Sequence, residues 1–79
     1  IVSKLEIFPN PSRDLVTLKN PTDEKMKVSL LNTTGQILED FEIKGKKEKR
    51  LDMSKFPRGI YFFRIELKKE IGVQKFILE

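Results

Sequence analysis

The strongest constraint on the fold of this chain is an alternation of apolar and polar side chains with a period of two residues. The alternation recurs over residues 4–7, 16–19, 26–30 and 61–67. Successive side chains of an extended chain point to opposite faces, so each segment is predicted to be a strand with one face in a core and the other in water. No segment carries a convincing helical period of roughly 3.6 residues, and we therefore expect no helix.

Turn-forming residues separate the alternating segments. Clusters of Pro, Gly, Asn, Asp and Ser lie near residues 9–12, 20–23, 32–35, 44–46, 57–59 and 69–72. They leave about seven predicted strands, near residues 3–8, 14–19, 25–32, 36–43, 46–53, 60–68 and 72–79. Short strands with turns every 8–12 residues or so are typical of one fold class. The prediction is a single all-β domain over residues 1–79, an immunoglobulin-like antiparallel β-sandwich.

The residue inventory argues against catalysis. The chain of 79 residues contains no cysteine and no histidine, which removes the usual metal ligands and the usual nucleophile–base pairs. Its 12 carboxylates fall mainly on solvent-facing strand positions, and no motif brings two of them together. We therefore expect no enzyme activity, no metal and no cofactor.

The charge pattern indicates an ordinary solvated surface. Charged residues make up 35% of the chain with a net charge of +4, and both signs are interspersed, so we expect no nucleic-acid partner. No apolar run approaches the roughly 20 residues of a spanning helix, so direct membrane insertion is not expected either. The densest basic stretch, residues 44–50, is either an anion-binding loop or a charged hairpin whose lysines protect a sheet edge. The second interpretation is favoured because charge on an exposed edge is common.

A corner is predicted before the most apolar strand. Phe56 precedes a turn at residues 57–59, and Tyr61 follows at the head of the strand. This arrangement resembles the tyrosine corner of Ig-like domains, in which the tyrosine hydroxyl bonds back to the backbone across the corner. The aromatic and aliphatic residues that we expect to hold the core of the motif are Phe56, Tyr61, Phe63, Ile65 and Phe76.

Two short motifs have local structural explanations. Asn32-Thr33-Thr34 matches the N-glycosylation pattern, but a turn before Gly35 explains the same residues. The segment 8–11, Phe-Pro-Asn-Pro, redirects the chain after the first strand, because each proline fixes its own φ and keeps the preceding residue extended. Whether a partner also recognises this bend is left open by the residues themselves.

Four elements in order resemble a known family. They are Phe-Pro-Asn-Pro-x-x-Asp over residues 8–14, a glycine after a strand at Gly35, Leu-Asp-Met-Ser-x-Phe-x-x-Gly-Ile-Tyr-Phe-x-x-Ile over residues 51–65, and Lys-x-Ile over residues 75–77. Together they cover nearly the whole chain and resemble the type A C-terminal sorting domain of the type IX secretion system, also called the Por secretion system. The final Glu79 departs from the family, which often ends in a basic residue.

The resemblance implies a secretion signal at the C-terminus of a larger cargo protein in a Gram-negative bacterium. Such a cargo reaches the periplasm by an N-terminal signal peptide, and its sorting domain takes it to the type IX outer-membrane translocation components. A sortase-like protease then removes the domain, and the cargo stays at the cell surface or is released outside the cell. This chain begins with neither a signal peptide nor Met, so we expect a piece excised from the C-terminus of a longer secreted protein.

We expect the secretion machinery to recognise a sorting signal of this kind through residues on its surface. The residues proposed for recognition are Pro9, Asn10, Pro11, Asp14, Gly35, Gly59 and Lys75. The domain is expected to be a monomer or a weak dimer through a sheet edge.

The alternative function is an Ig-like or fibronectin-like adhesion or spacer module of a surface protein, including one that binds carbohydrate. Carbohydrate sites usually present exposed aromatic rings, and the chain has no Trp. Phe62, on the face opposite Tyr61 and Phe63, is the candidate for such a ring.

Overall fold

Seven β-strands account for most of the chain. The computed structural model describes residues 5–10 and 14–79, with the backbone alone at Pro9 and Asn10. The strands are β1 (Glu6–Asn10), β2 (Leu15–Lys19), β3 (Met26–Leu31), β4 (Ile37–Ile43), β5 (Glu48–Asp52), β6 (Gly59–Glu66) and β7 (Ile71–Leu78). Each lies where the alternation predicts a strand, with small differences at the ends. The described residues contain no helix long and apolar enough to span a membrane.

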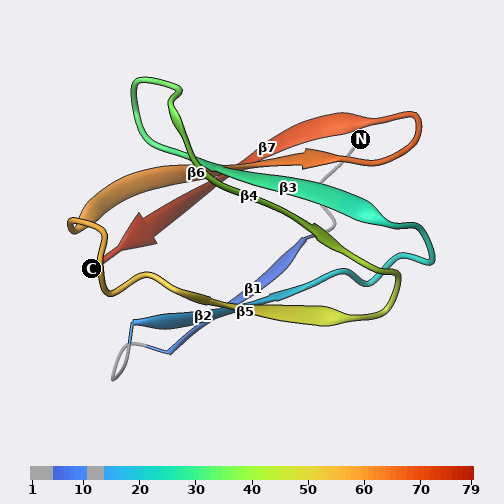
Figure 1. Ribbon diagram of the computed structural model, residues 1–79, viewed down its shortest axis with the longest axis horizontal. Helices are drawn as coiled ribbons and strands as arrows, with labels where there is room; N and C mark the ends of the chain where they lie inside the picture. The colour runs from blue at the N-terminus through green and yellow to red at the C-terminus, as the bar shows by residue number, and fades with distance from the viewer. Residues whose placement is uncertain (1–4, 11–13) are drawn as a thin grey trace.

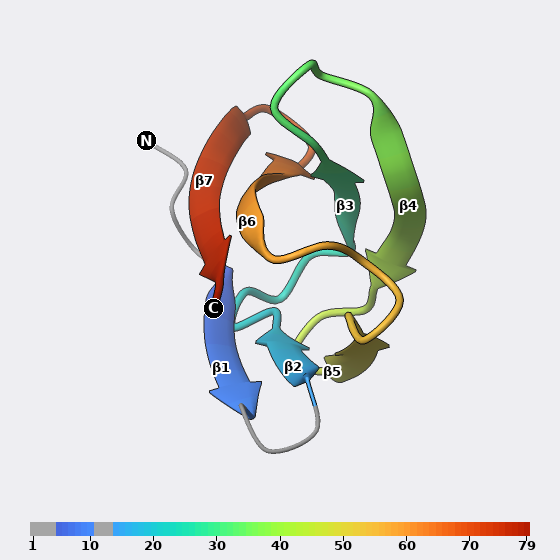
Figure 2. The same ribbon diagram turned by 90° about the vertical axis from the view of Figure 1, so that its left-hand side faces the viewer.

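The strands form two antiparallel sheets that pack face to face (Figures 1 and 2). One sheet has the order β1-β2-β5, and the other has the order β4-β3-β6-β7. This arrangement confirms the predicted Ig-like sandwich. The chain crosses from one sheet to the other between β2 and β3, between β4 and β5, and between β5 and β6.

The predicted hairpin over residues 44–50 is wrong, because β4 and β5 belong to different sheets and do not pair. The predicted protection of an edge is confirmed, since β5 is an outer strand whose charged side chains include Lys49 and Arg50. Lys46 binds locally: its Nζ donates a hydrogen bond of 2.7 Å to the carbonyl oxygen of Pro21.

The core lies between the two sheets and follows the alternation. In β6 the buried residues are Tyr61, Phe63 and Ile65, and the residues between them are half-buried. The ring of Phe76 on β7 packs against Phe63 with a centroid distance of 5.7 Å. Phe56 is partly buried and packs against this cluster. All five residues predicted for the core are therefore placed in it or against it.

The first strand runs further than predicted. It continues through Pro9 and Asn10, which pair with Val16 and Leu15 of β2. Proline is tolerated there because β1 is an edge strand, where one side of the backbone needs no sheet hydrogen bond. Pro9 and Asn10 therefore belong to the strand and not to the predicted bend, and Pro11 lies outside the described residues.

A buried asparagine holds the connection between β2 and β3. Asn20 is 0% exposed, and its Nδ2 donates hydrogen bonds to the carbonyl oxygens of Glu24 (2.6 Å) and Ile43 (2.9 Å). Its Oδ1 accepts from the backbone N–H of Thr22 at 3.0 Å and from the Thr22 hydroxyl at 2.6 Å. One side chain therefore binds backbone groups of two connections. Glu24 lies between β2 and β3, and Ile43 is the last residue of β4, where the chain leaves the larger sheet.

Asn32 builds a similar turn between β3 and β4. Its Oδ1 accepts hydrogen bonds from the Thr34 N–H at 3.0 Å, the Thr34 hydroxyl at 2.7 Å and the Gln36 N–H at 3.0 Å. These bonds are exposed to solvent, in contrast to those of Asn20. They confirm the predicted turn before Gly35.

Replacing Asn20 with Ala is expected to lower the free energy of unfolding by about 2–4 kcal/mol, because buried backbone carbonyls lose their donors. Asn20→Asp, which keeps the shape but removes both donors, is expected to destabilise at least as much at neutral pH. Urea unfolding followed by circular dichroism measures both changes. Asn32→Ala is the matched control and is expected to cost about 0.5–1 kcal/mol, since water replaces its exposed bonds; equal losses at the two positions would contradict the role of burial.

Candidate recognition surface

Three of the four resembling elements come together at one end of the sandwich. The end of β1 and the start of β2, the turn between β3 and β4 and the corner between β5 and β6 all lie at the left-hand end in Figure 1. The last strand also finishes there, because Leu78 pairs with Gly59 at the start of β6. Figure 2 views this end face-on, with the β3–β4 turn at the top and the corner between β5 and β6 below it.

An ion pair joins the first element to the third. Two nitrogens of the Arg58 guanidinium bind the two carboxylate oxygens of Asp14, with Nη1–Oδ1 and Nη2–Oδ2 distances of 2.5 and 3.1 Å. The hydrogen bonds that Arg58 donates to the Asp14 carboxylate raise the pKa of Arg58 above its usual value. The backbone adds a second link, since the Met53 N–H donates to the Asp14 carbonyl at 2.9 Å. The start of β2 and the corner after β5 are therefore one connected structure.

Asp14 also has an unusual backbone conformation. Its φ is 56°, in the left-handed region that Asp tolerates better than most residues. The side chain of Asp14 is only 20% exposed and its carboxylate is occupied by Arg58. Asp14, which the sequence proposed as a recognition contact, therefore also stabilises the corner between β5 and β6 through its bonds to Arg58 and Met53.

The corner itself is a tyrosine corner, as predicted. The Tyr61 hydroxyl donates a hydrogen bond to the carbonyl oxygen of Pro57, and the rings of Phe56 and Tyr61 lie 6.2 Å apart. Gly59 begins β6 with a φ of 145°, which side chains rarely adopt and which explains the glycine at this position.

The remaining residues of the third element complete the same corner. The Ser54 N–H donates to Asp52 Oδ1 at 2.9 Å, and the Phe56 N–H donates to the Met53 carbonyl at 3.0 Å. Hydrogen bonds from the backbone and the side chain of Ser54 lower the pKa of Asp52. The Asp-Met-Ser sequence therefore turns the chain as it leaves β5.

Gly35 and Lys75 lie apart from the corner. Gly35 is exposed in the β3–β4 turn and has a φ of 85°, so the turn itself requires glycine there. Lys75 is exposed in the middle of β7, opposite Phe62 of β6. The side chains of Pro9, Asn10 and Pro11 lie outside the described residues. The structure thus brings Asp14 and Gly59 together, places Gly35 at the same end, and leaves Lys75 on the sheet.

Two residues at this surface were not predicted. Arg58 occupies a position that no motif marked, and only the folded chain places it against Asp14. Phe8 is 51% exposed on β1, although it belongs to the first element. Its exposure follows from the alternation, because the neighbouring Ile7 faces the core. Phe62, the candidate ring for a carbohydrate, is only half-exposed.

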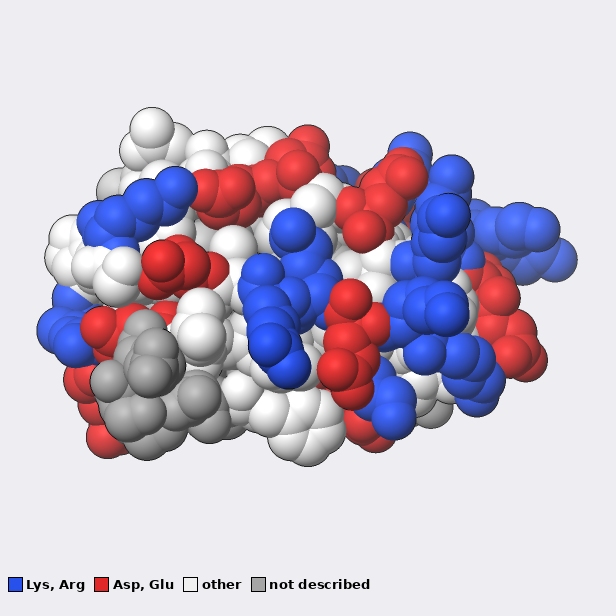
Figure 3. Space-filling view, turned by 60° about the horizontal axis from the view of Figure 1, so that its bottom comes forward, with Lys and Arg blue, Asp and Glu red and all other residues white. Residues whose placement is uncertain are grey.

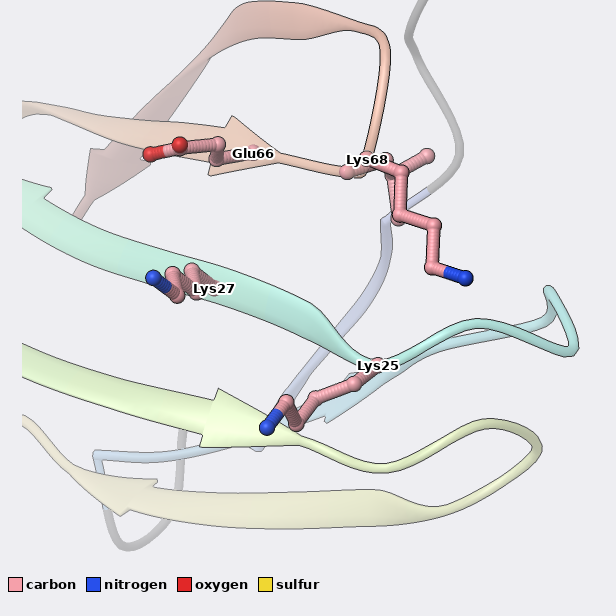
Figure 4. A pocket seen from close by; sticks show the side chains of 5 residues that line it. Lys25, Lys27, Glu66 and Lys68 are labelled. Carbon is pink, nitrogen blue, oxygen red and sulfur yellow. The ribbon is translucent and has the colours of Figure 1, made fainter.

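The described surface also includes a hollow away from this corner. Lys25, Lys27, Glu66, Leu67 and Lys68 line a shallow hollow between β3 and β6 (Figure 4). Three lysines and one glutamate line it; Lys25 Nζ lies 3.6 Å from Glu42 Oε1, and Lys27 lies opposite Glu42 of β4 and Glu66 of β6 in the strand register. Figure 3 shows acidic and basic side chains interspersed over another face, with Lys and Arg gathered at the end away from the corner.

Comparison with known proteins identifies the family. Residues 6–79 match the family described as the secretion system C-terminal sorting domain, which is the sorting domain of type IX secretion. The chain belongs to this family. The match includes β1 to β7, so the sorting domain is the whole sandwich and not one of its segments. No curated protein matches the chain.

Membership gives the sorting domain its general function. It is a type IX secretion signal, which directs export across the outer membrane to the cell surface or the outside of the cell. The family is not a class of enzymes. Membership also implies attachment to a cargo protein and interaction with the type IX secretion machinery.

The Asp14–Arg58 pair is expected to couple the two connections. In a double-mutant cycle of Asp14→Asn and Arg58→Gln, urea unfolding is expected to show a favourable coupling that decreases at high salt, because the partners are bidentate but partly exposed. The control is the Lys25–Glu42 pair, whose single contact of 3.6 Å joins more exposed groups. Additive effects at Asp14 and Arg58 would contradict the coupling.

Tyr61 is expected to act through both its ring and its hydroxyl. Tyr61→Phe removes the bond to Pro57 and should lower the free energy of unfolding by about 1 kcal/mol. Tyr61→Ala also removes a buried ring and should cost about 3–5 kcal/mol. Thermal and urea unfolding measure both variants. Unchanged stability of Tyr61→Ala would refute the structural role.

Proposed function

We propose that this sorting domain carries a cargo protein, joined to its N-terminal side, from the periplasm through the type IX outer-membrane translocation components. We further propose that a sortase-like protease then cleaves the domain from the cargo. The observation that supports this proposal most directly is the gathering of sequence-distant motif elements at one end of a single sandwich. An ion pair, a backbone hydrogen bond and a tyrosine corner hold that end together.

Recognition through a folded end explains why the motif is spread along the chain. Asp14 and Arg58 are 44 residues apart in sequence, yet their side chains bind each other. A short linear signal would not need this separation. The translocation components would therefore bind a surface that exists only after the domain has folded.

The surface offers an apolar contact beside its polar corner. Phe8 is 51% exposed on β1 and lies opposite Thr17 of β2. Phe8 is therefore the aromatic residue of the first element that is available to a partner. We assign it to recognition together with the backbone positions set by Asp14, Gly35 and Gly59, and with Pro9, Asn10, Pro11 and Lys75 as proposed from the sequence.

The proposal is tested by fusing residues 1–79 to the C-terminus of a periplasmic reporter in a bacterium with a working type IX system. The reporter is expected outside the cell, and in the periplasm when the translocon is inactivated. Loss of about 9.3 kDa from the secreted reporter reports cleavage separately from export. Retention of a folded fusion in the periplasm would overturn the proposed function, and export at full size would overturn cleavage alone.

Two phenylalanine variants of the fusion separate recognition from folding. Phe8→Ala is expected to change the free energy of unfolding by less than about 0.5 kcal/mol but to reduce export, because Phe8 is exposed. Phe63→Ala is expected to abolish export by unfolding the domain, at a cost of about 3–5 kcal/mol, because Phe63 is 0% exposed. Normal export of Phe8→Ala would remove Phe8 from the recognised surface.

A further inference from the structure

The end of the sandwich opposite the corner is rich in lysine. The β2–β3, β4–β5 and β6–β7 connections lie together there, at the right-hand end in Figure 1. Residues 44–47 are Lys-Gly-Lys-Lys and residues 67–70 are Leu-Lys-Lys-Glu, and all the lysines of these two connections are exposed. Edge protection explains Lys49 and Arg50 on β5 but not these lysines, because the 44–47 and 67–70 connections lie outside the strands.

The two connections carry a local excess of positive charge. They contain five lysines and one carboxylate, Glu70. Lys46 is engaged, since its Nζ donates to the Pro21 carbonyl and lies 3.9 Å from Asp23 Oδ1. Among the described residues no carboxylate forms an ion pair with the other four amines, which belong to Lys44, Lys47, Lys68 and Lys69. These four cations are therefore available to an external anion.

Hydrogen bonds hold both connections against the segment between β2 and β3. The Lys46 N–H donates to the Thr22 carbonyl at 3.0 Å, and the Lys68 N–H donates to Glu24 Oε1 at 3.2 Å. The packing is close, because a Cβ at Gly45 would lie 2.5 Å from a backbone oxygen of this segment. The backbone that carries the lysines is therefore fixed, and binding an anion would order only their side chains.

The spread of the four amines determines which kind of anion fits. The 44–47 connection leaves β4 and the 67–70 connection enters β7, and these are the outer strands of the four-stranded sheet. Three strand spacings of about 4.8 Å place the two outer strands about 14 Å apart. A single phosphate or carboxylate is too small to contact both connections, so the array fits a surface that carries many anions. Residues 19–25, 43–48 and 66–71 include no aromatic ring on which a nucleic acid base could stack.

We propose that this lysine-rich end binds the anionic headgroups of a membrane surface. The four unpaired amines supply the attraction, and the domain adsorbs at the level of the headgroups without entering the hydrocarbon. Each lysine near such a surface strengthens binding about fivefold, and the attraction is screened beyond about 8 Å at physiological salt. The binding is therefore reversible and depends on the local density of anionic lipid.

Binding in this orientation leaves the opposite end accessible. The corner with Asp14 and Arg58 lies at the other end of the sandwich (Figure 1) and points away from the lipid. Strand β1 starts at the lysine-rich end, because Glu6 pairs with Lys19 at the end of β2. A cargo joined to the N-terminal side would therefore meet the domain beside the membrane. That last point rests on the proposed function, whereas the lipid binding does not.

Co-sedimentation of the chain with vesicles tests the proposal. The chain is expected to bind vesicles of one part phosphatidylglycerol and two parts phosphatidylcholine, and binding should decrease as salt is added. Two double variants, Lys44→Gln with Lys47→Gln and Lys68→Gln with Lys69→Gln, are each expected to weaken binding about 10- to 30-fold. Thermal unfolding of the variants is expected to be unchanged, because all four side chains are exposed.

The matched control is Arg50→Gln with Lys75→Gln, which removes the same charge from exposed positions within β5 and β7. It is expected to weaken binding less than about threefold, because these positions lie outside the lysine array. Equal losses in the control and in the two lysine pairs would overturn the proposal, as would equal binding to phosphatidylcholine alone. Displacement by inorganic phosphate beyond that by sodium chloride at equal ionic strength would overturn it too, since it indicates a site for a single phosphate. None of these outcomes affects the export test of the proposed function.

Lipid quenching tests the orientation, because the chain has no cysteine of its own. A fluorophore attached to Lys69→Cys is expected to be quenched by a headgroup-labelled lipid. The same fluorophore attached to Thr33→Cys, in the turn between β3 and β4 at the other end, is expected to be quenched much less. Equal quenching at the two positions, or stronger quenching at Thr33→Cys, would overturn the proposed orientation.

Discussion

The structure depends on burying the inward faces of β3 and β6, which lie side by side at the centre of the larger sheet. A domain of this size buries only about 60% of the surface that its unfolded chain exposes, so few side chains are available for a core. The chain has no cysteine, and therefore no disulfide supplements that core. Met26, Val28, Leu30, Phe63 and Ile65 are each 0% exposed and carry much of the apolar packing. Hydrogen bonds and an ion pair of polar side chains stabilise the segments that connect the strands around this core.

Those polar groups are arranged differently at the two ends of the sandwich. At one end the buried Asn20 satisfies backbone groups of its own turn and of Ile43. At the other end, partly exposed groups make the bonds: Asp14 with Arg58, and the Tyr61 hydroxyl with Pro57. The recognition proposed for the Asp14 end needs ordered groups that a partner can reach, and the Asp14–Arg58 pair is ordered and partly exposed.

The edges of the sheets show a similar division. Charges on β4 and β5 and the proline of β1 discourage further pairing, but β7 keeps exposed β-branched side chains and an unpaired buried amide. Among the described strands β7 is therefore the apolar edge of the sandwich, with Lys75 as its one charged residue.

Alternation and the turn-forming residues together were sufficient to place the strands and most of the core. It marked Tyr61, Phe63 and Ile65 as buried, because a period of two leaves a strand only one apolar face to hide. The local turn chemistry at Gly35 and the tyrosine corner also followed from short segments, since their hydrogen bonds join residues close in sequence.

What the tertiary structure decided was which distant segments meet. The assignment of β4 and β5 to different sheets, which made the expected hairpin wrong, depends on how the sheets pack and not on the turn between the strands. The same holds for Arg58, whose partner lies 44 residues away. The first and last strands become edges on the same side for the same reason. In this protein the sequence determined each strand and the side that it buries, because those depend on neighbouring residues. The folded sandwich decided which motif residues lie together at one end, because that depends on contacts between residues far apart in the chain.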